Sequence, residues 1–197
     1  MDKSDEQDPQ GIDKSLFEDP ILIDYKAQYI IKPKNYSKQD KEACIICKIV
    51  VKDENTARYE IYRDDLAIVF LNLYPYQVGH LLVSPLRHIM GYEELNEKEI
   101  KSTSVLVQRC LQMLTHFGRT ESFNVGWNQG KTSGGSIKHN HIHVVPRYPN
   151  ELNFFEIIAK TKPIIQSLED THSYLCQYRE FLAGNKSIEE LDIKSEW

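Results

Sequence analysis

Hydrophobic and polar positions alternate over short stretches in the middle of the chain, as in β-strands whose side chains point to opposite faces of a sheet. Residues 58–62 and 66–71, joined by a turn at Asp64 and Asp65, predict a β-hairpin. Residues 79–85 predict a third strand, residues 123–127 a fourth, and residues 139–147 a fifth. The pattern therefore predicts five strands.

Between the third and fourth predicted strands, the spacing of apolar residues predicts a helix. Asn96, followed three residues later by Glu99, is typical of an N-terminal capping box, and apolar residues then recur at helical spacing until Gly118. A last helix is predicted from about residue 162 to residue 182. Because few strands alternate with crossover helices, we expect an α+β fold: a five-stranded antiparallel sheet, a long helix and a C-terminal helical extension.

The same pattern suggests where the chain divides. The first residues are polar and acidic, and a stretch with linker character follows at about residues 33–41. We expect an N-terminal extension at residues 1–40, one folded domain at residues 41–150, and a C-terminal helical extension at residues 151–197.

Composition narrows the class of protein. The 197-residue chain has a formal net charge of −5, which disfavours broad nucleic-acid binding but not a small polyphosphate ligand. Its apolar runs are too short to span a bilayer, and its start lacks the basic and apolar parts of a signal peptide. The sequence therefore predicts a cytoplasmic protein without a membrane segment.

Three histidines alternate along the last predicted strand, at His139, His141 and His143. They would share one face of the sheet, opposite Asn140 and Ile142. Imidazoles fill a core poorly because each ring nitrogen needs a partner, although a polar face turned to water is an alternative. They are well suited to hold phosphate, to form a bond to phosphorus or to bind a metal. The middle histidine, His141, is the candidate nucleophile, because its neighbours can orient substrate oxygens.

A Gly/Ser-rich loop, residues 128–136, directly precedes the histidines. Its backbone amides and hydroxyls could donate to phosphate oxygens, although such loops often only turn the chain. Lys131 in this loop adds a positive charge and is a candidate phosphate ligand. The position of the loop beside the histidines favours phosphate binding.

Cys44 and Cys47 form a C-x-x-C pair. Two thiolates at this spacing can chelate a tetrahedral zinc ion, take part in redox chemistry or simply be buried. Zinc needs two further ligands, and the spacing of the seven histidines does not decide which of them would serve.

At these residues the sequence resembles the histidine triad (HIT) family of nucleotide hydrolases and transferases. The family signature H-φ-H-φ-H-φ-φ, with φ apolar, matches residues 139–145 except that Asn140 occupies the first φ position. The resemblance covers roughly residues 41–150 and extends more weakly into the C-terminal extension, where it is similar to bacterial diadenosine tetraphosphate phosphorylases. It implies the HIT fold and a homodimer.

The resemblance also implies a role for individual residues. His141 would attack the α-phosphate to give a nucleotidyl-histidine, and His143 would bind phosphate oxygens beside it. Asn72 and His80 would contact the ribose, while the phosphates and leaving group would be held by Asn128, Gly134 and Ser136. In zinc-containing members the ligands correspond to Cys44, Cys47, His88 and His139, which implies one structural zinc ion.

The expected function is cleavage of a dinucleoside polyphosphate, of the diadenosine tetraphosphate type, through nucleotidyl-His141. The acceptor could be water or orthophosphate. The alternatives are hydrolysis of nucleoside phosphoramidates, or a nucleotide-binding sensor whose turnover is incidental. The sequence does not reveal the base preference, the acceptor or a physiological partner.

Overall fold

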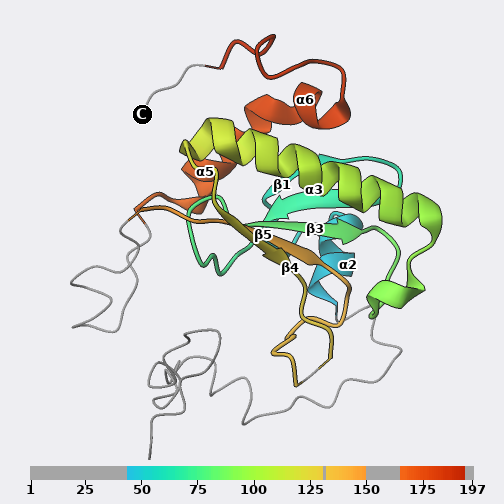
Figure 1. The fold of residues 1–197 in the computed structure, drawn as a ribbon. Helices are drawn as coiled ribbons and strands as arrows, with labels where there is room; N and C mark the ends of the chain where they lie inside the picture. Colours follow the sequence, from blue (N-terminus) through green and yellow to red (C-terminus); the bar gives the residue numbers. More distant parts are fainter. Residues whose placement is uncertain (1–43, 131, 150–164, 194–197) are drawn as a thin grey trace, which may run out of the picture. The chain divides into compact units, whose positions relative to one another are not determined.

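The computed structural model describes residues 44–130, 132–149 and 165–193. Five strands form one antiparallel sheet in the order β1-β2-β3-β5-β4 (Figure 1). The strands are β1 (Glu60–Arg63), β2 (Ala67–Leu71), β3 (Leu81–Pro85), β4 (Phe123–Gly126) and β5 (Ile142–Pro146). The predicted five-stranded antiparallel sheet is confirmed.

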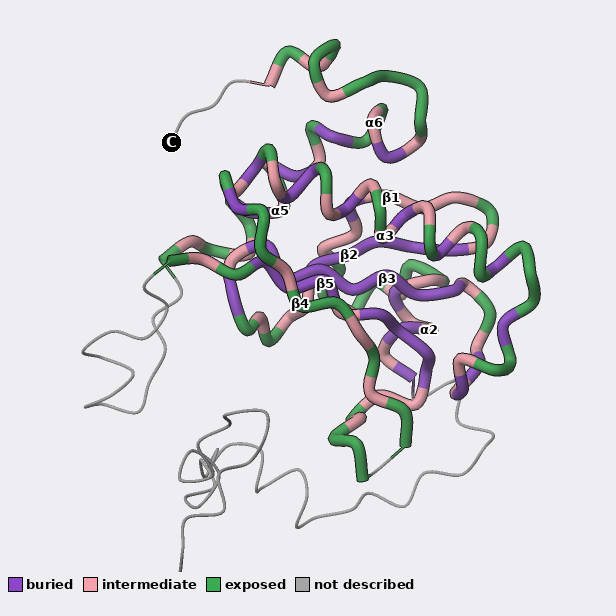
Figure 2. Tube along the Cα trace, viewed as in Figure 1, coloured by how far each residue is buried: buried purple, intermediate pink, exposed green. Residues whose placement is uncertain are grey.

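The long helix α3 (Glu97–Gly118) covers one face of the sheet. It begins as the sequence predicts: the Asn96 side chain accepts from the backbone N–H of Glu99, and the Glu99 carboxylate accepts from the backbone N–H of Asn96. Its inner residues, including Leu106, Met113 and Leu114, are buried against strand residues of the central core (Figure 2). In the described part of the chain, no helix is both long and apolar enough to cross a membrane.

A short helix that the sequence pattern did not predict, α2 (Ile45–Val50), packs on the other face of the sheet. Ile46 and Ile49 of α2 are buried with Ile68, Phe70 and Leu82, which are alternate strand residues that point away from α3. The sheet is therefore covered on both faces, and the first cysteine of the C-x-x-C pair is the N-cap residue of α2.

The C-terminal segment differs from its prediction. In place of one helix over residues 162–182, of which residues 162–164 lie outside the described residues, there are α5 (Leu168–Leu175), a 3-10 turn η3 (Cys176–Tyr178) and α6 (Arg179–Ala183). The Ser167 side chain caps α5 by accepting from the Asp170 N–H, so the helix starts later than predicted. The buried residues Leu175, Tyr178 and Leu182 keep helical spacing across the break, so the apolar period did not reveal it.

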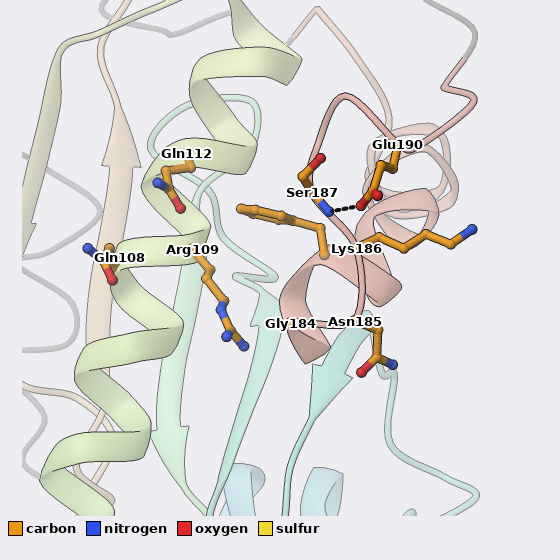
Figure 3. A pocket seen from close by; sticks show the side chains of 9 residues that line it. Gln108, Arg109, Gln112, Gly184, Asn185, Lys186, Ser187 and Glu190 are labelled. Carbon is orange, nitrogen blue, oxygen red and sulfur yellow. Dashed lines mark hydrogen bonds between the residues drawn. The ribbon is translucent and has the colours of Figure 1, made fainter.

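A groove of about 390 Å³ lies between α3 and this C-terminal segment (Figure 3). Arg109 of α3 crosses toward Gly184 and donates to the carbonyl of Leu182 at 2.7 Å. The opposite wall is formed by the C-terminal segment, in which the Ser187 N–H donates to the Glu190 carboxylate at 2.7 Å. The histidine triad does not line this groove.

Candidate functional site

The three histidines of the triad, His139, His141 and His143, lie on both sides of the first residue of β5. Only His143 lies within the strand, which begins at Ile142, so the predicted strand over residues 139–147 was too long. The segment before it bonds elsewhere: Asn140 N–H donates to the carbonyl of Ile89 at 2.7 Å, and Ser84 Oγ donates to the Asn140 carbonyl at 2.8 Å. His139 and His141 are therefore held by loop contacts and not by the regular strand ladder.

His141 is buried and has a fixed tautomer. Its Nδ1 lies 2.6 Å from the backbone carbonyl of His139, and because a carbonyl can only accept, Nδ1 carries the proton. Burial lowers the pKa of His141, while the bond to the His139 carbonyl acts in the opposite direction. The ring is therefore neutral near pH 7, and its Nε2 presents a lone pair, as a nucleophile requires.

His143 belongs to a second chain of hydrogen bonds. The backbone N–H of Tyr76 donates to His80 Nδ1 at 3.0 Å, so this nitrogen is unprotonated. Burial, aided by the nearby His143 and His141, lowers the pKa of His80 to about 3, so His80 is neutral and its proton lies on Nε2. That proton is donated to His143 Nδ1, 2.9 Å away. Neutral His143 consequently carries its own proton on Nε2.

The two Nε2 atoms at the ends of these chains are chemically complementary. The rings of His141 and His143 lie 4.9 Å apart in a T-shaped arrangement. His141 offers a lone pair and His143 offers an N–H, so the pair can attack an electrophile and donate to a neighbouring oxygen without prior protonation.

The structure places Asn72 and His80 next to one another: Asn72 Nδ2 lies 3.3 Å from His80 Nδ1. The exposed fraction of His80 is 0%, and its ring is covered by Tyr76, at 4.6 Å between centroids. His80 thus has no surface open to a ribose in this structure, and its contacts are those of a residue that orients His143.

The glycine-rich loop begins directly after β4, whose last residue, Gly126, pairs with His143 of the triad. Gly134 adopts φ +83°, a conformation that favours glycine, and Ser136 is exposed. A Cβ on Gly135 would lie 2.9 Å from the carbonyl oxygen of Asn128, so glycine lets the loop fold back on its own start. Lys131 lies outside the described residues.

A second group, the Cys/His cluster, consists of Cys44, Cys47, His88 and His139, whose ligand atoms all lie within 4.8 Å of one another. Cys47 Sγ is 3.1 Å from His88 Nδ1 and 3.5 Å from His139 Nδ1, and Cys44 Sγ is 3.6 Å from His139 Nδ1. The structure thus brings together the four residues that the resemblance implied, and they could hold one metal ion.

The geometry of the cluster suits a tetrahedral ion. Zinc bound to sulfur at about 2.3 Å and to nitrogen at about 2.0–2.1 Å would hold those two ligand atoms about 3.6 Å apart. His139 is also oriented for this role, because its Nε2–H donates to the Pro85 carbonyl at 2.9 Å and leaves Nδ1 free to coordinate. Burial lowers the pKa of His139 to about 4, which keeps the ring neutral, as a ligand must be.

Sequence reasoning missed two features of the site. Tyr76 supplies the backbone N–H that sets the tautomer of His80, and its ring lies 6.0 Å from that of His143, nearly parallel. The stacked pair Tyr92 and Trp127 flanks the glycine-rich loop. No residue pattern indicated either contact, since both depend on which loops the fold brings together.

Comparison with known proteins identifies relatives of this chain. The model of the HIT domain matches residues 53–150. An AP-4-A phosphorylase from Mycobacterium tuberculosis is 40% identical over 116 residues, which are 58% of this chain and 60% of that protein. The match thus spans less than two thirds of that relative's length. An uncharacterized HIT-like protein from Borreliella burgdorferi is 33% identical over 55% of this chain and 78% of its own length.

Among solved structures, a Zn-bound histidine triad family protein from Mycobacterium smegmatis superposes with a TM-score of 0.58. It is 25% identical, and the superposition covers 73% of this chain and 96% of that protein. The likeness therefore includes nearly the whole of the smaller structure.

Proposed function

The chain belongs to the HIT family, and we propose that it is a nucleotidyl hydrolase or transferase that cleaves dinucleoside polyphosphates at the α-phosphate. The observation that carries this proposal is the complementary pair of ring nitrogens: a lone pair on His141 Nε2 beside a proton on His143 Nε2. The name of the 40%-identical AP-4-A phosphorylase supports diadenosine tetraphosphate as the first substrate to test.

The reaction would proceed in two displacements at phosphorus. His141 Nε2 forms a bond to the α-phosphorus, while the bond from that phosphorus to the bridging oxygen breaks and the remaining polyphosphate leaves. Water or orthophosphate then attacks nucleotidyl-His141 and releases the ring. Water yields AMP, and orthophosphate yields ADP. Two steps replace one difficult displacement because the neutral imidazole of His141 is a good leaving group from the nucleotidyl-imidazolium intermediate.

His143 would support both steps from beside the nucleophile. Its Nε2–H can donate to the bridging oxygen as negative charge develops there. His80, which donates to His143 Nδ1, would keep that proton on Nε2. Loop residues Asn128, Gly134 and Ser136 would hold the phosphate oxygens, and Lys131 would add positive charge near them.

The Cys/His cluster would hold one structural zinc ion. The proposal rests on the fit of its sulfur–nitrogen separations, 3.1 to 3.6 Å, to tetrahedral coordination, and on two thiolates in the donor set. When bound, the ion would cross-link α2, the segment after β3 and the approach to β5. This would fix His139, whose carbonyl orients His141.

We also propose that the protein is a homodimer through the free edge of β4. β4 is the outer strand of the described sheet, and its outer edge pairs with no other strand of that sheet. Such an edge presents backbone N–H and C=O groups and is a template for pairing with another chain.

Product analysis tests the proposal. Diadenosine tetraphosphate is incubated with and without orthophosphate, with His141→Ala as the control. ADP formed only with phosphate identifies a phosphorylase, and AMP plus ATP in both tubes identifies a hydrolase. No product that depends on His141 in either tube would refute dinucleotide cleavage and direct the next assay to nucleoside phosphoramidates and to nucleotide binding without turnover.

A further inference from the structure

The start of the phosphate-binding loop is fixed to a part of the chain that lies outside the triad. Trp127, which directly precedes the loop, stacks on Tyr92 with ring centroids 4.5 Å apart and an interplanar angle of 16°. Tyr92 belongs to the 3-10 turn η2 (Tyr92–Glu94), between β3 and α3. The exposed fraction of Trp127 is 46%, as expected for an indole with one face covered.

Gln129 reinforces this stack with two hydrogen bonds. Its Oε1 accepts from the backbone N–H of Tyr92 at 3.0 Å, and its Nε2 donates to the Glu93 carboxylate at 2.8 Å. An amide side chain that uses both of its groups on one turn has a defined orientation. The stack and these two bonds together join residues 127–129 to η2.

The far end of the loop is tied to the same stretch of chain. His139 Nε2 donates to the Pro85 carbonyl, and Asn140 N–H donates to the Ile89 carbonyl. This stretch, residues 85–94, is itself anchored to α3, because Arg87 donates to both carboxylate oxygens of the buried Glu99, at 2.8 and 2.7 Å. One anchored segment therefore holds both ends of the loop.

The interior of the loop depends on its start. Ser133 Oγ donates to the carbonyls of Gln129 and Gly130, each at 2.8 Å, and Gly135 lies against the carbonyl of Asn128. The position of the described residues 132–136 thus depends on the position of residues 128–130. Positioning of the start consequently sets the position of the backbone amides and hydroxyls of residues 132–136.

We propose that Tyr92, Trp127 and Gln129 form a latch that positions the phosphate-binding loop and so determines the affinity of the site for phosphorylated ligands. These are positioning residues, because they act through the loop. The proposal rests on the proposed function only in assigning phosphate binding to the loop.

The test compares Trp127→Ala with Trp127→Phe and with Val125→Ala in the full-length protein. Val125 is the matched control, since it lies two residues earlier in the chain, within β4, and is equally exposed, at 47%, but takes no part in the latch. The first readout is hydrogen exchange of the amides of residues 132–138 without ligand. The second is the affinity for ADP, measured by calorimetry.

Trp127→Ala is expected to speed exchange in residues 132–138 and to weaken ADP binding about two- to tenfold, the range that loss of one aromatic pair implies. With diadenosine tetraphosphate, KM should change more than kcat. Trp127→Phe should restore most of the affinity because a ring remains, and Val125→Ala should match the wild type.

Three results would overturn the latch: unchanged exchange in Trp127→Ala, unchanged ADP affinity despite faster exchange, or an equal effect in Val125→Ala. The last would assign the effect to the edge strand as a whole. Failure of the proposed function is distinguishable, because it appears as the absence of His141-dependent product in the wild type, whereas exchange and ADP affinity still report on the latch.

Discussion

Two groups of histidines in this molecule use the same side chain for different chemistry. In the Cys/His cluster, His139 donates from Nε2 to the Pro85 carbonyl and directs Nδ1 at two sulfur atoms. Two residues later, His141 donates from Nδ1 to the carbonyl of His139 and leaves Nε2 free. In each ring, the nitrogen that donates to a backbone carbonyl carries the proton, so the other nitrogen keeps its lone pair for metal binding or nucleophilic attack.

The comparison also shows that burial serves both groups. Burial lowers the pKa values of His139, His141 and His80, so all three rings are neutral at pH 7. A neutral ring is needed for a metal ligand and for a nucleophile alike. What separates the two groups is the neighbouring atoms: thiols around His139, and further imidazoles around His141.

The largest expected effect comes from removing the nucleophile. His141→Ala should lower turnover of diadenosine tetraphosphate by about 10³-fold or more, since loss of the attacking group in other enzymes costs at least this much. The measurement is product formation over time. His116→Gln, which keeps a polar group beside the Tyr178 hydroxyl at an exposed position of α3, is the control and should retain activity. Comparable rates for the two variants would show that the chemistry does not pass through His141.

Removing one thiol should affect the other group in a different way. Cys47→Ser is expected to lower zinc from about one ion per chain to near zero, and to lower the melting temperature, because metal binding is coupled to folding. Metal analysis and thermal unfolding measure the two effects. Cys176→Ser, at a half-buried thiol outside the cluster, should retain the metal. Wild-type protein purified without chelator and free of zinc would contradict the assignment.

A smaller effect should follow from breaking the bond that orients His143. His80→Leu removes the donor to His143 Nδ1 and should lower kcat by roughly 10²-fold, a typical contribution of one positioned proton donor. His80→Gln retains an amide N–H and should recover part of the loss. Substrates with more acidic leaving groups should be less sensitive, because they need less proton donation. Equal losses in His80→Leu and His80→Gln would argue for a purely structural role.

The smallest effect, about tenfold in the folding equilibrium for each pH unit, concerns stability and pH. The folded pKa of His80, about 3, lies below the unfolded value of about 6.5, so the unfolded chain binds the extra proton. The contribution of His80 to stability is therefore complete above pH 6.5 and is lost as pH falls toward 3. In this window the wild type should lose about 1.4 kcal/mol per pH unit more than His80→Leu.

Denaturant unfolding at several pH values measures this difference. Parallel pH profiles for the wild type and His80→Leu would mean that His80 is protonated in the folded protein at moderate pH, and the proton order deduced for His143 would then be wrong.

The sequence determined much of the fold and family. The alternation of apolar residues predicted the five strands, and Asn96 with Glu99 predicted the start of α3, because strand alternation and helix capping are local properties of neighbouring residues. The histidine pattern at residues 139–145 indicated the family. The helix over residues 162–182 was predicted wrongly because a 3-10 turn preserves the apolar spacing that an α-helix would show.

Only the tertiary structure decided the chemistry of individual nitrogens. The tautomer of His80 depends on the Tyr76 amide, and that of His139 depends on the Pro85 carbonyl 54 positions away. Spacing alone could not choose His88 and His139 from seven histidines as partners of the C-x-x-C pair. A hydrogen bond or a ligand contact acts over about 3 Å in space. The sequence records which groups are available, whereas the packing of the sheet, α2 and the loops determines which of them meet.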